Sequence, residues 1–139
     1  MKLEFKVTEL SHVDIVEILS SACYNNECMS IRYNKNLLKD IPRHGSDCFE
    51  DRAADLLLAG KHIYVIDWDA EGQAYGDLPH SELEDNVLKY RVTLEDFIKG
   101  MNTEKAMPYV YQLHEEGMLD SYNAYMLLQI IVFGEEIYG

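Results

Sequence analysis

Residues 122–133, with the sequence YNAYMLLQIIVF, constrain the fold more than any other segment of this chain. The run is apolar nearly all round, with Asn123 and Gln129 as its polar members. A helix of this kind is typical of the centre of a domain, where neighbouring elements cover every side. Its longest apolar part, residues 124–133, has about half of the roughly 20 residues that a membrane-spanning helix needs. We therefore predict a helix buried in a protein core and no membrane span.

Five segments carry the start signals of helices, which are a short polar side chain at the cap position or a proline in the first turn. The starts are Ser11, Asp47, Thr93, Pro108, and Asp120 or Ser121. The first helix is expected over residues 12–23. The second is expected to end at Gly60 and the fourth at Gly117, because glycine readily adopts the left-handed conformation that ends helices.

Segments that alternate polar and apolar residues, or that are rich in Ile, Val and Tyr, predict the strands. They cover residues 2–8, 29–33, 62–68, 73–78 and 86–92, with a turn at residues 69–72. Strands and helices in this order predict a single α+β domain over residues 1–139. The small, antiparallel sheet is expected to have about 3–4 strands and to pack against about five helices, with a helical C-terminal half.

Acidic residues are concentrated in the second part of the chain. Lys and Arg number 12 against 25 Asp and Glu, for a net charge of −13. The part up to Lys61 contains 8 basic and 10 acidic residues, whereas the part from His62 onward contains 4 and 15. The net charges of the two parts are therefore −2 and −11, and no Lys or Arg follows Lys105.

This charge disfavours direct binding of nucleic acids and of anionic membranes, and it favours association with a basic protein partner. We predict partner-binding residues in and around the acidic window of residues 67–85, where no Lys or Arg occurs. These candidates are Asp67, Trp68, Asp69, Glu71, Asp77, Glu82, Glu84 and Asp85. In the extreme case their carboxylates imitate the phosphates of DNA and block a nucleic-acid-binding protein. The alternative is an acidic surface that serves solubility alone.

Three cysteines and one histidine have a spacing that resembles a structural zinc site. Cys23, Cys28, His44 and Cys48 form two close pairs separated by a loop, as tetrahedral zinc sites require. The alternative is a set of ordinary reduced thiols, because Cys23 falls on the apolar stripe of a predicted helix. An odd number of cysteines and the absence of a signal peptide at the N-terminus favour a cytoplasmic protein.

Ten tyrosines are many for a chain of this length, and tyrosine is enriched at interfaces. Tyr122 and Tyr125 lie three residues apart and are expected to pack in the core, whereas at least one of Tyr109 and Tyr111 is expected at the surface. An oligomer that buries a Tyr-rich surface is one hypothesis that this composition leaves open, and the sequence does not set the oligomeric state.

The motifs of nucleotide-binding loops, serine hydrolases and zinc proteases do not occur in the sequence. We therefore expect a non-enzymatic interaction module without a cofactor. The alternative is a metal-stabilised domain or a small metal-dependent enzyme that uses the Cys/His cluster or the pair Asp67 and Asp69. That pair begins a loop like the calcium loop of an EF-hand, but Leu78 stands where the bidentate Glu is needed, so a hairpin turn explains it better.

Overall fold

The computed structural model describes residues 6–24, 26, 28–68, 81–84, 87–116 and 119–138, and for residues 81–84, 87 and 116 it describes the backbone. The elements, in chain order, are α1 (His12–Cys23), β1 (Met29–Arg32), the 3-10 helix η1 (Lys35–Leu38), α2 (Phe49–Leu58), β2 (His62–Asp67), β3 (Ser81–Glu84), β4 (Val87–Thr93), α3 (Leu94–Met101), α4 (Met107–Tyr111), the π-helix η2 (Gln112–Glu116) and α5 (Ser121–Phe133).

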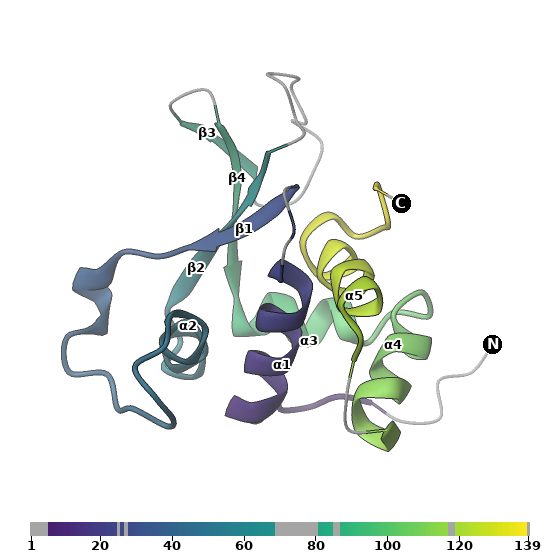
Figure 1. Ribbon diagram of the computed structural model, residues 1–139, viewed down its shortest axis with the longest axis horizontal. Helices are drawn as coiled ribbons and strands as arrows, with labels where there is room; N and C mark the ends of the chain where they lie inside the picture. Colours follow the sequence, from purple (N-terminus) through teal and green to yellow (C-terminus); the bar gives the residue numbers. More distant parts are fainter. Residues whose placement is uncertain are drawn as a thin grey trace.

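The four strands form one antiparallel sheet in the order β1-β2-β4-β3, seen in the upper half of Figure 1. Val65 of β2 is paired with Ile31 of β1 on one side and with Tyr90 of β4 on the other. The predicted α+β fold, with a small antiparallel sheet and a largely helical C-terminal half, is confirmed.

The sheet has a buried inner face and a more exposed outer face, as the two-residue period of a strand requires. The inner-face residues Ile63, Val65, Tyr90 and Val92 of β2 and β4 are each 1% exposed or less. Helices α1, α2 and α3 pack against the sheet at β1, β2 and β4, respectively.

Helix α5 is the centre of the helical layer, as its sequence predicts. Every residue from Ala124 to Phe133 is buried, and α5 packs against α1, α3 and α4. At Gly100 of α3, a Cβ atom would stand 2.8 Å from the Cα of Ile131, so the two helices approach too closely for any larger residue there. Asp120 caps α5 by accepting a hydrogen bond from the backbone of Asn123.

Four of the predicted helix starts are confirmed. Ser11, Thr93 and Asp120 each accept a backbone N–H through a side-chain oxygen, and Pro108 lies in the first turn of α4. The predicted cap at Asp47 is wrong. Cys48 is the cap residue of α2, because Asp47 pairs its carboxylate with Arg43 at 2.9 Å instead of turning toward the helix.

The strand predicted over residues 2–8 is wrong in its described part, because residues 6–8 form no strand. Both backbone groups of Val7 bond to the side-chain amide of Asn102, at 2.7 and 2.8 Å, which directs this segment to the end of α3 rather than to the sheet. The predicted strand at 73–78, the turn at 69–72 and the helix end at Gly117 lie outside the described residues. In the described part of the chain, no helix is long and apolar enough to cross a membrane.

Candidate functional site

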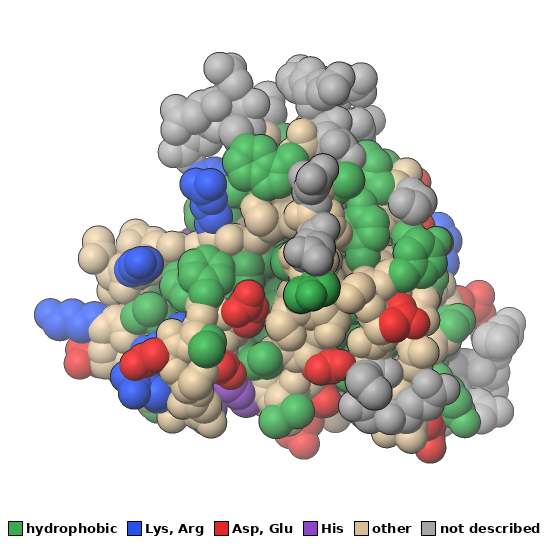
Figure 2. Space-filling model, in the orientation of Figure 1, with side chains coloured by type: hydrophobic (Ala, Val, Ile, Leu, Met, Phe, Trp, Pro, Cys, Tyr) green, Lys and Arg blue, Asp and Glu red, His purple; other side chains and the backbone are tan. Residues whose placement is uncertain are grey.

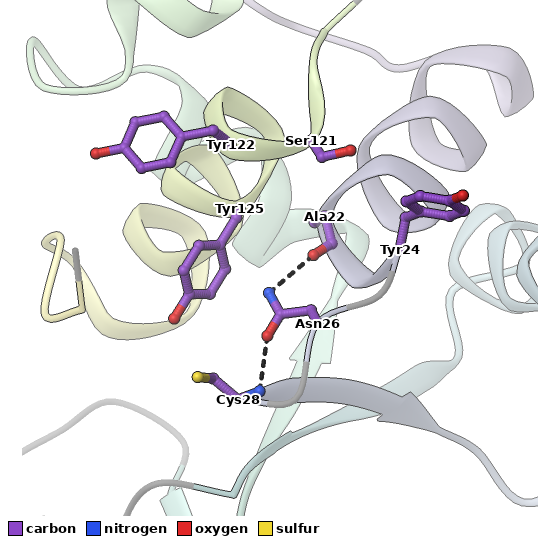
Figure 3. Close-up of a pocket in the computed structure, with 7 residues that line it drawn as sticks. All are labelled: Ala22, Tyr24, Asn26, Cys28, Ser121, Tyr122 and Tyr125. Carbon is purple, nitrogen blue, oxygen red and sulfur yellow. Dashed lines mark hydrogen bonds between the residues drawn. The ribbon is translucent and has the colours of Figure 1, made fainter.

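A surface groove lined by tyrosines lies where the end of α1 meets the start of α5. It has a volume of about 400 Å³ and opens to solvent. We call it the tyrosine groove, and its lining residues are Ala22, Tyr24, Asn26, Cys28, Ser121, Tyr122 and Tyr125. Figure 3 shows Tyr122 and Tyr125 projecting from α5 on one side and Tyr24 at the end of α1 on the other.

The floor of the groove is fixed by the side chain of Asn26. Its amide nitrogen donates to the carbonyl of Ala22 at 3.0 Å, and its oxygen accepts from the backbone N–H of Cys28 at 2.7 Å (Figure 3). The same oxygen also accepts from the backbone N–H of Met29 at 3.1 Å. Asparagine suits this position because its short amide satisfies backbone groups that neither α1 nor β1 pairs. The Asn26 side chain therefore connects the end of α1 to the start of β1.

The expectation that Tyr122 and Tyr125 both pack in the core is half confirmed. Tyr125 is 8% exposed, but Tyr122 is 60% exposed and Tyr24 is 68% exposed. Tyr122 lies in the first turn of α5, and its ring points away from α1 (Figure 3). The spacing of three residues carries no information on which neighbouring elements cover that turn.

Acidic side chains surround the tyrosines of α4 and α5. The Tyr109 hydroxyl donates to the carboxylate of Glu136 at 2.5 Å. Burial, the Glu136 carboxylate and nearby Tyr122 together raise the pKa of Tyr109 to about 12. Asp120 and Glu136 are exposed. In Figure 2, Lys and Arg gather mostly on the side of η1 and α2, and the side of α4 and α5 shows mostly Asp and Glu.

Two of the predicted partner-binding residues have described side chains. Asp67 is 2% exposed, and its carboxylate accepts a hydrogen bond from the Tyr138 hydroxyl. Its predicted place on a partner surface or in a calcium-like loop is therefore corrected, because the carboxylate is buried and bonded inside the protein. Trp68 is 44% exposed, as an interface anchor requires, and its indole N–H donates to Ser30 at 2.8 Å.

The other six predicted partner-binding residues are not placed at the level of side chains. Glu82 and Glu84 lie on β3, for which the backbone alone is described, and Glu82 is paired in register with Lys89. Outside the described residues lie Asp69, Glu71, Asp77 and Asp85. Whether these carboxylates share a face therefore stays a prediction.

The four predicted metal ligands are not brought together. Among the described residues, no three His, Cys, Asp or Glu side chains lie close enough to hold a metal ion. His44 directs Nδ1 to the carboxylate of Asp55 at 2.8 Å, and Cys28 lines the tyrosine groove. Cys23 is partly buried in α1, whereas Cys48 is exposed at the start of α2.

The histidines instead meet a buried carboxylate that the sequence analysis did not identify. Asp55 of α2 is fully buried, and one of its oxygens accepts from the Arg52 guanidinium at 2.6 Å. Its other oxygen accepts from His44, and His12 Nε2 lies 3.3 Å from that same oxygen. The His12 and His44 rings are stacked with their centroids 5.7 Å apart. We call these four residues the Asp55 cluster.

The Asp55 cluster joins α1, α2 and the loop before α2. Since the carboxylate and carbonyl oxygens around the rings are acceptors, His44 carries a proton on Nδ1, and His12 carries one on Nε2, which also donates to the carbonyl of Asp51. Arg52 additionally donates to the carbonyl of Ile41 at 3.3 Å. Because both carboxylate oxygens have internal partners, the cluster acts as a structural clamp on the loop, with the partly exposed His44 at its edge.

No family model, curated protein or solved structure matches this chain. No residue therefore receives a role from a relative. The tyrosine groove and the charges around it are the basis on which a function can be proposed.

Proposed function

We propose that this chain is a non-enzymatic interaction module that binds a basic protein partner, with a Lys or Arg side chain of the partner seated in the tyrosine groove. The observation that carries the proposal is the exposed Tyr122. It lines the groove, and it is 60% exposed. It also belongs to the segment after Lys105, in which the sequence contains no Lys or Arg.

Tyrosine and carboxylate groups together suit a cationic side chain. A cation over a tyrosine ring gains about 0.5–1 kcal/mol at an exposed site and about 2 kcal/mol when water is excluded. Tyrosine is also frequent among the few residues that dominate binding energies at interfaces. The exposed carboxylates of Asp120 and Glu136 add a negative potential that steers a basic partner toward the groove.

The acidic window is an extension of the same proposal. Trp68 is exposed at one end of this window. A partner-binding role for Trp68, Asp69, Glu71, Asp77, Glu82, Glu84 and Asp85 stays a prediction from the sequence. Mimicry of DNA phosphates by this window is a narrower form of the hypothesis. It requires that the partner be a nucleic-acid-binding protein, and that DNA compete with this chain for binding to that partner.

The test is binding of a labelled oligoarginine peptide, followed by fluorescence anisotropy at low salt. Tyr122→Ala is expected to weaken binding by about tenfold, because it removes one wall of the groove. Tyr111→Ala is the matched control, since Tyr111 is 55% exposed on neighbouring α4 but does not line the groove. The control is expected to bind within about twofold of the unchanged protein.

Equal binding by the Tyr122→Ala and Tyr111→Ala variants would show that the peptide responds to net charge alone, and the groove would lose its assigned role. Glu136→Gln provides a second measurement. If the carboxylate beside Tyr109 contributes as proposed, this variant weakens binding and lowers the salt dependence, whereas Glu95→Gln, at an exposed position on α3, does so less.

A further inference from the structure

The outer face of the sheet carries a group of cations in a chain that is acidic as a whole. Every second residue of β1, β2 and β4 points to this face, and Trp68 continues the β2 series. The outer-face residues with described side chains are Ser30, Arg32, His62, Tyr64, Ile66, Trp68, Lys89, Arg91 and Thr93. They include the three cations Arg32, Lys89 and Arg91. The register of β3 places Glu82 opposite Lys89 and Glu84 opposite Val87, so two acidic positions of this series lie at the β3 edge. Arg32 lies on β1 at the other edge of the sheet, and Arg91 has no partner position in β3.

Two exposed arginines flank one tyrosine in a row across three strands. The register places Tyr64 of β2 opposite Arg32 of β1 and also opposite Arg91 of β4. Both arginines are exposed, and neither forms an ion pair with any side chain that the structure describes. Their guanidinium groups are therefore available to an anionic ligand.

The aromatic rings of this face hold cations rather than presenting open surfaces. Lys89 Nζ lies 4.3 Å from the centroid of the Tyr64 ring, and the Arg32 guanidinium carbon lies 5.8 Å from that of Trp68. His62 meets the edge of Tyr64, with centroids 5.2 Å apart. Such contacts restrict the positions of the cations, and they occupy ring faces on which nucleic acid bases would stack.

We propose that this outer face binds an acidic polypeptide segment, with carboxylates of the segment paired to Arg32 and Arg91. Arginine binds a carboxylate through two parallel hydrogen bonds. Arg32 and Arg91 therefore favour a ligand that carries two separate carboxylates. A single-stranded nucleic acid is the less suitable ligand, because Lys89 and Arg32 occupy ring faces on which its bases would stack. This surface is distinct from the tyrosine groove and has the opposite charge preference.

The test is the binding of a labelled oligoglutamate peptide, measured by fluorescence anisotropy at low salt. The double variant Arg32→Glu/Arg91→Glu is expected to weaken binding by at least about tenfold, because two charge-assisted hydrogen-bond partners are lost. The matched control is Lys35→Glu/Lys39→Glu, which changes the net charge equally at exposed positions in and beside η1. The control is expected to stay within about twofold of the unchanged protein.

Trp68 reports where the peptide binds, because it is the only tryptophan and Arg32 lies over its ring. Its emission is expected to change during the titration in the unchanged protein and in the control variant. Three results would overturn the proposal: no peptide binding at low salt, equal loss in both double variants, or tighter binding of a single-stranded oligonucleotide than of the peptide. If Arg32→Glu/Arg91→Glu does not fold, the Gln substitutions at the same positions keep the comparison open.

Discussion

The hydroxyl of Tyr138 lies 2.7 and 2.9 Å from the two carboxylate oxygens of Asp67, a residue 71 positions earlier in the chain, and donates its hydrogen bond to them. Asp67 is 2% exposed, and a buried carboxylate requires such donors. Gln129 holds the same C-terminal segment, because its side chain bonds to the backbone of Ile137 and Tyr138 at 2.7–3.0 Å. The segment after α5 is therefore part of the folded core at the end of β2.

Removal of the Tyr138 hydroxyl tests this connection. Tyr138→Phe is expected to lower the free energy of unfolding by about 1–2 kcal/mol, since a buried carboxylate loses a donor while the ring still fills its space. Urea denaturation measures the change. Tyr111→Phe, which removes an exposed hydroxyl, is expected to change stability by less than about 0.5 kcal/mol. Equal effects of the two variants would mean that the hydroxyl of Tyr138 is not bonded inside the protein.

The close approach of α3 and α5 predicts an unusual response to alanine. Gly100→Ala places a Cβ 2.8 Å from the Cα of Ile131 and 3.2 Å from its Cγ1. We expect a net loss of about 1–3 kcal/mol from overpacking, against the gain of about 1 kcal/mol that alanine usually brings to a helix. Thermal unfolding measures it, with the exposed Lys99→Ala as control. A stabilised Gly100→Ala variant would contradict the packing of these two helices.

Two Asp–Arg pairs allow a comparison of buried and exposed ion pairs in one molecule. Asp55→Asn is expected to destabilise the protein by about 3–5 kcal/mol, because Arg52 then lacks its carboxylate in a buried site. Asp47→Asn breaks the pair with Arg43, whose side chains are 71% and 56% exposed, and is expected to cost about 0–1 kcal/mol. Chemical denaturation of the two variants gives the difference, and similar values would disprove the role of the Asp55 cluster as a clamp.

Local signals predicted much of the fold. The caps at Ser11, Thr93 and Asp120 act within one turn of the chain, so their effect is visible in a few residues of sequence. The segment at residues 6–8 has a strand-like pattern, but the amide of Asn102, 95 residues away from Val7, competes successfully for its backbone groups. Such a long-range contact has no signature in local periodicity.

The candidate site likewise combines features that local sequence predicts with features that depend on tertiary contacts. The exposure of Tyr122 depends on which elements cover the first turn of α5, and the buried Asp67 carboxylate depends on the Tyr138 hydroxyl. The charge partition was evident from composition, whereas the cationic outer face of the sheet required the register that aligns Arg32, Tyr64 and Arg91. Residue types indicated the chemistry, and tertiary pairing determined which side chains meet.

The contact between Tyr109 and Glu136 predicts a change in stability at high pH. Burial and the neighbouring carboxylate raise the pKa of Tyr109 from 10.0 to about 12, so the folded state favours the protonated phenol. Its contribution to stability is fully present below pH 10.0 and is lost as the pH rises through about 12. NMR titration of the Tyr109 ring is expected to show a lower pKa in Glu136→Gln. The control Glu135→Gln changes an exposed carboxylate that does not bond to Tyr109, and an equal effect of both variants would exclude the direct contact.

The thiols are expected to differ strongly in reactivity. Burial, followed by the negative charge of Glu50, raises the pKa of Cys23 to about 12, and the thiolate is the form that reacts with alkylating agents and binds zinc. In the folded protein at neutral pH, iodoacetamide is therefore expected to modify exposed Cys48 and to leave Cys23 unmodified, as peptide mass spectrometry would show.

In denaturant the difference between Cys23 and Cys48 is expected to disappear, because unfolding exposes both thiols. Cys48→Ser identifies the fast site by removing it. Rapid modification of Cys23 in the folded state would show that the packing of α1 against α2 leaves this thiol open. Such a result would also restore Cys23 as a candidate zinc ligand, since a thiol that ionises at neutral pH no longer opposes metal binding.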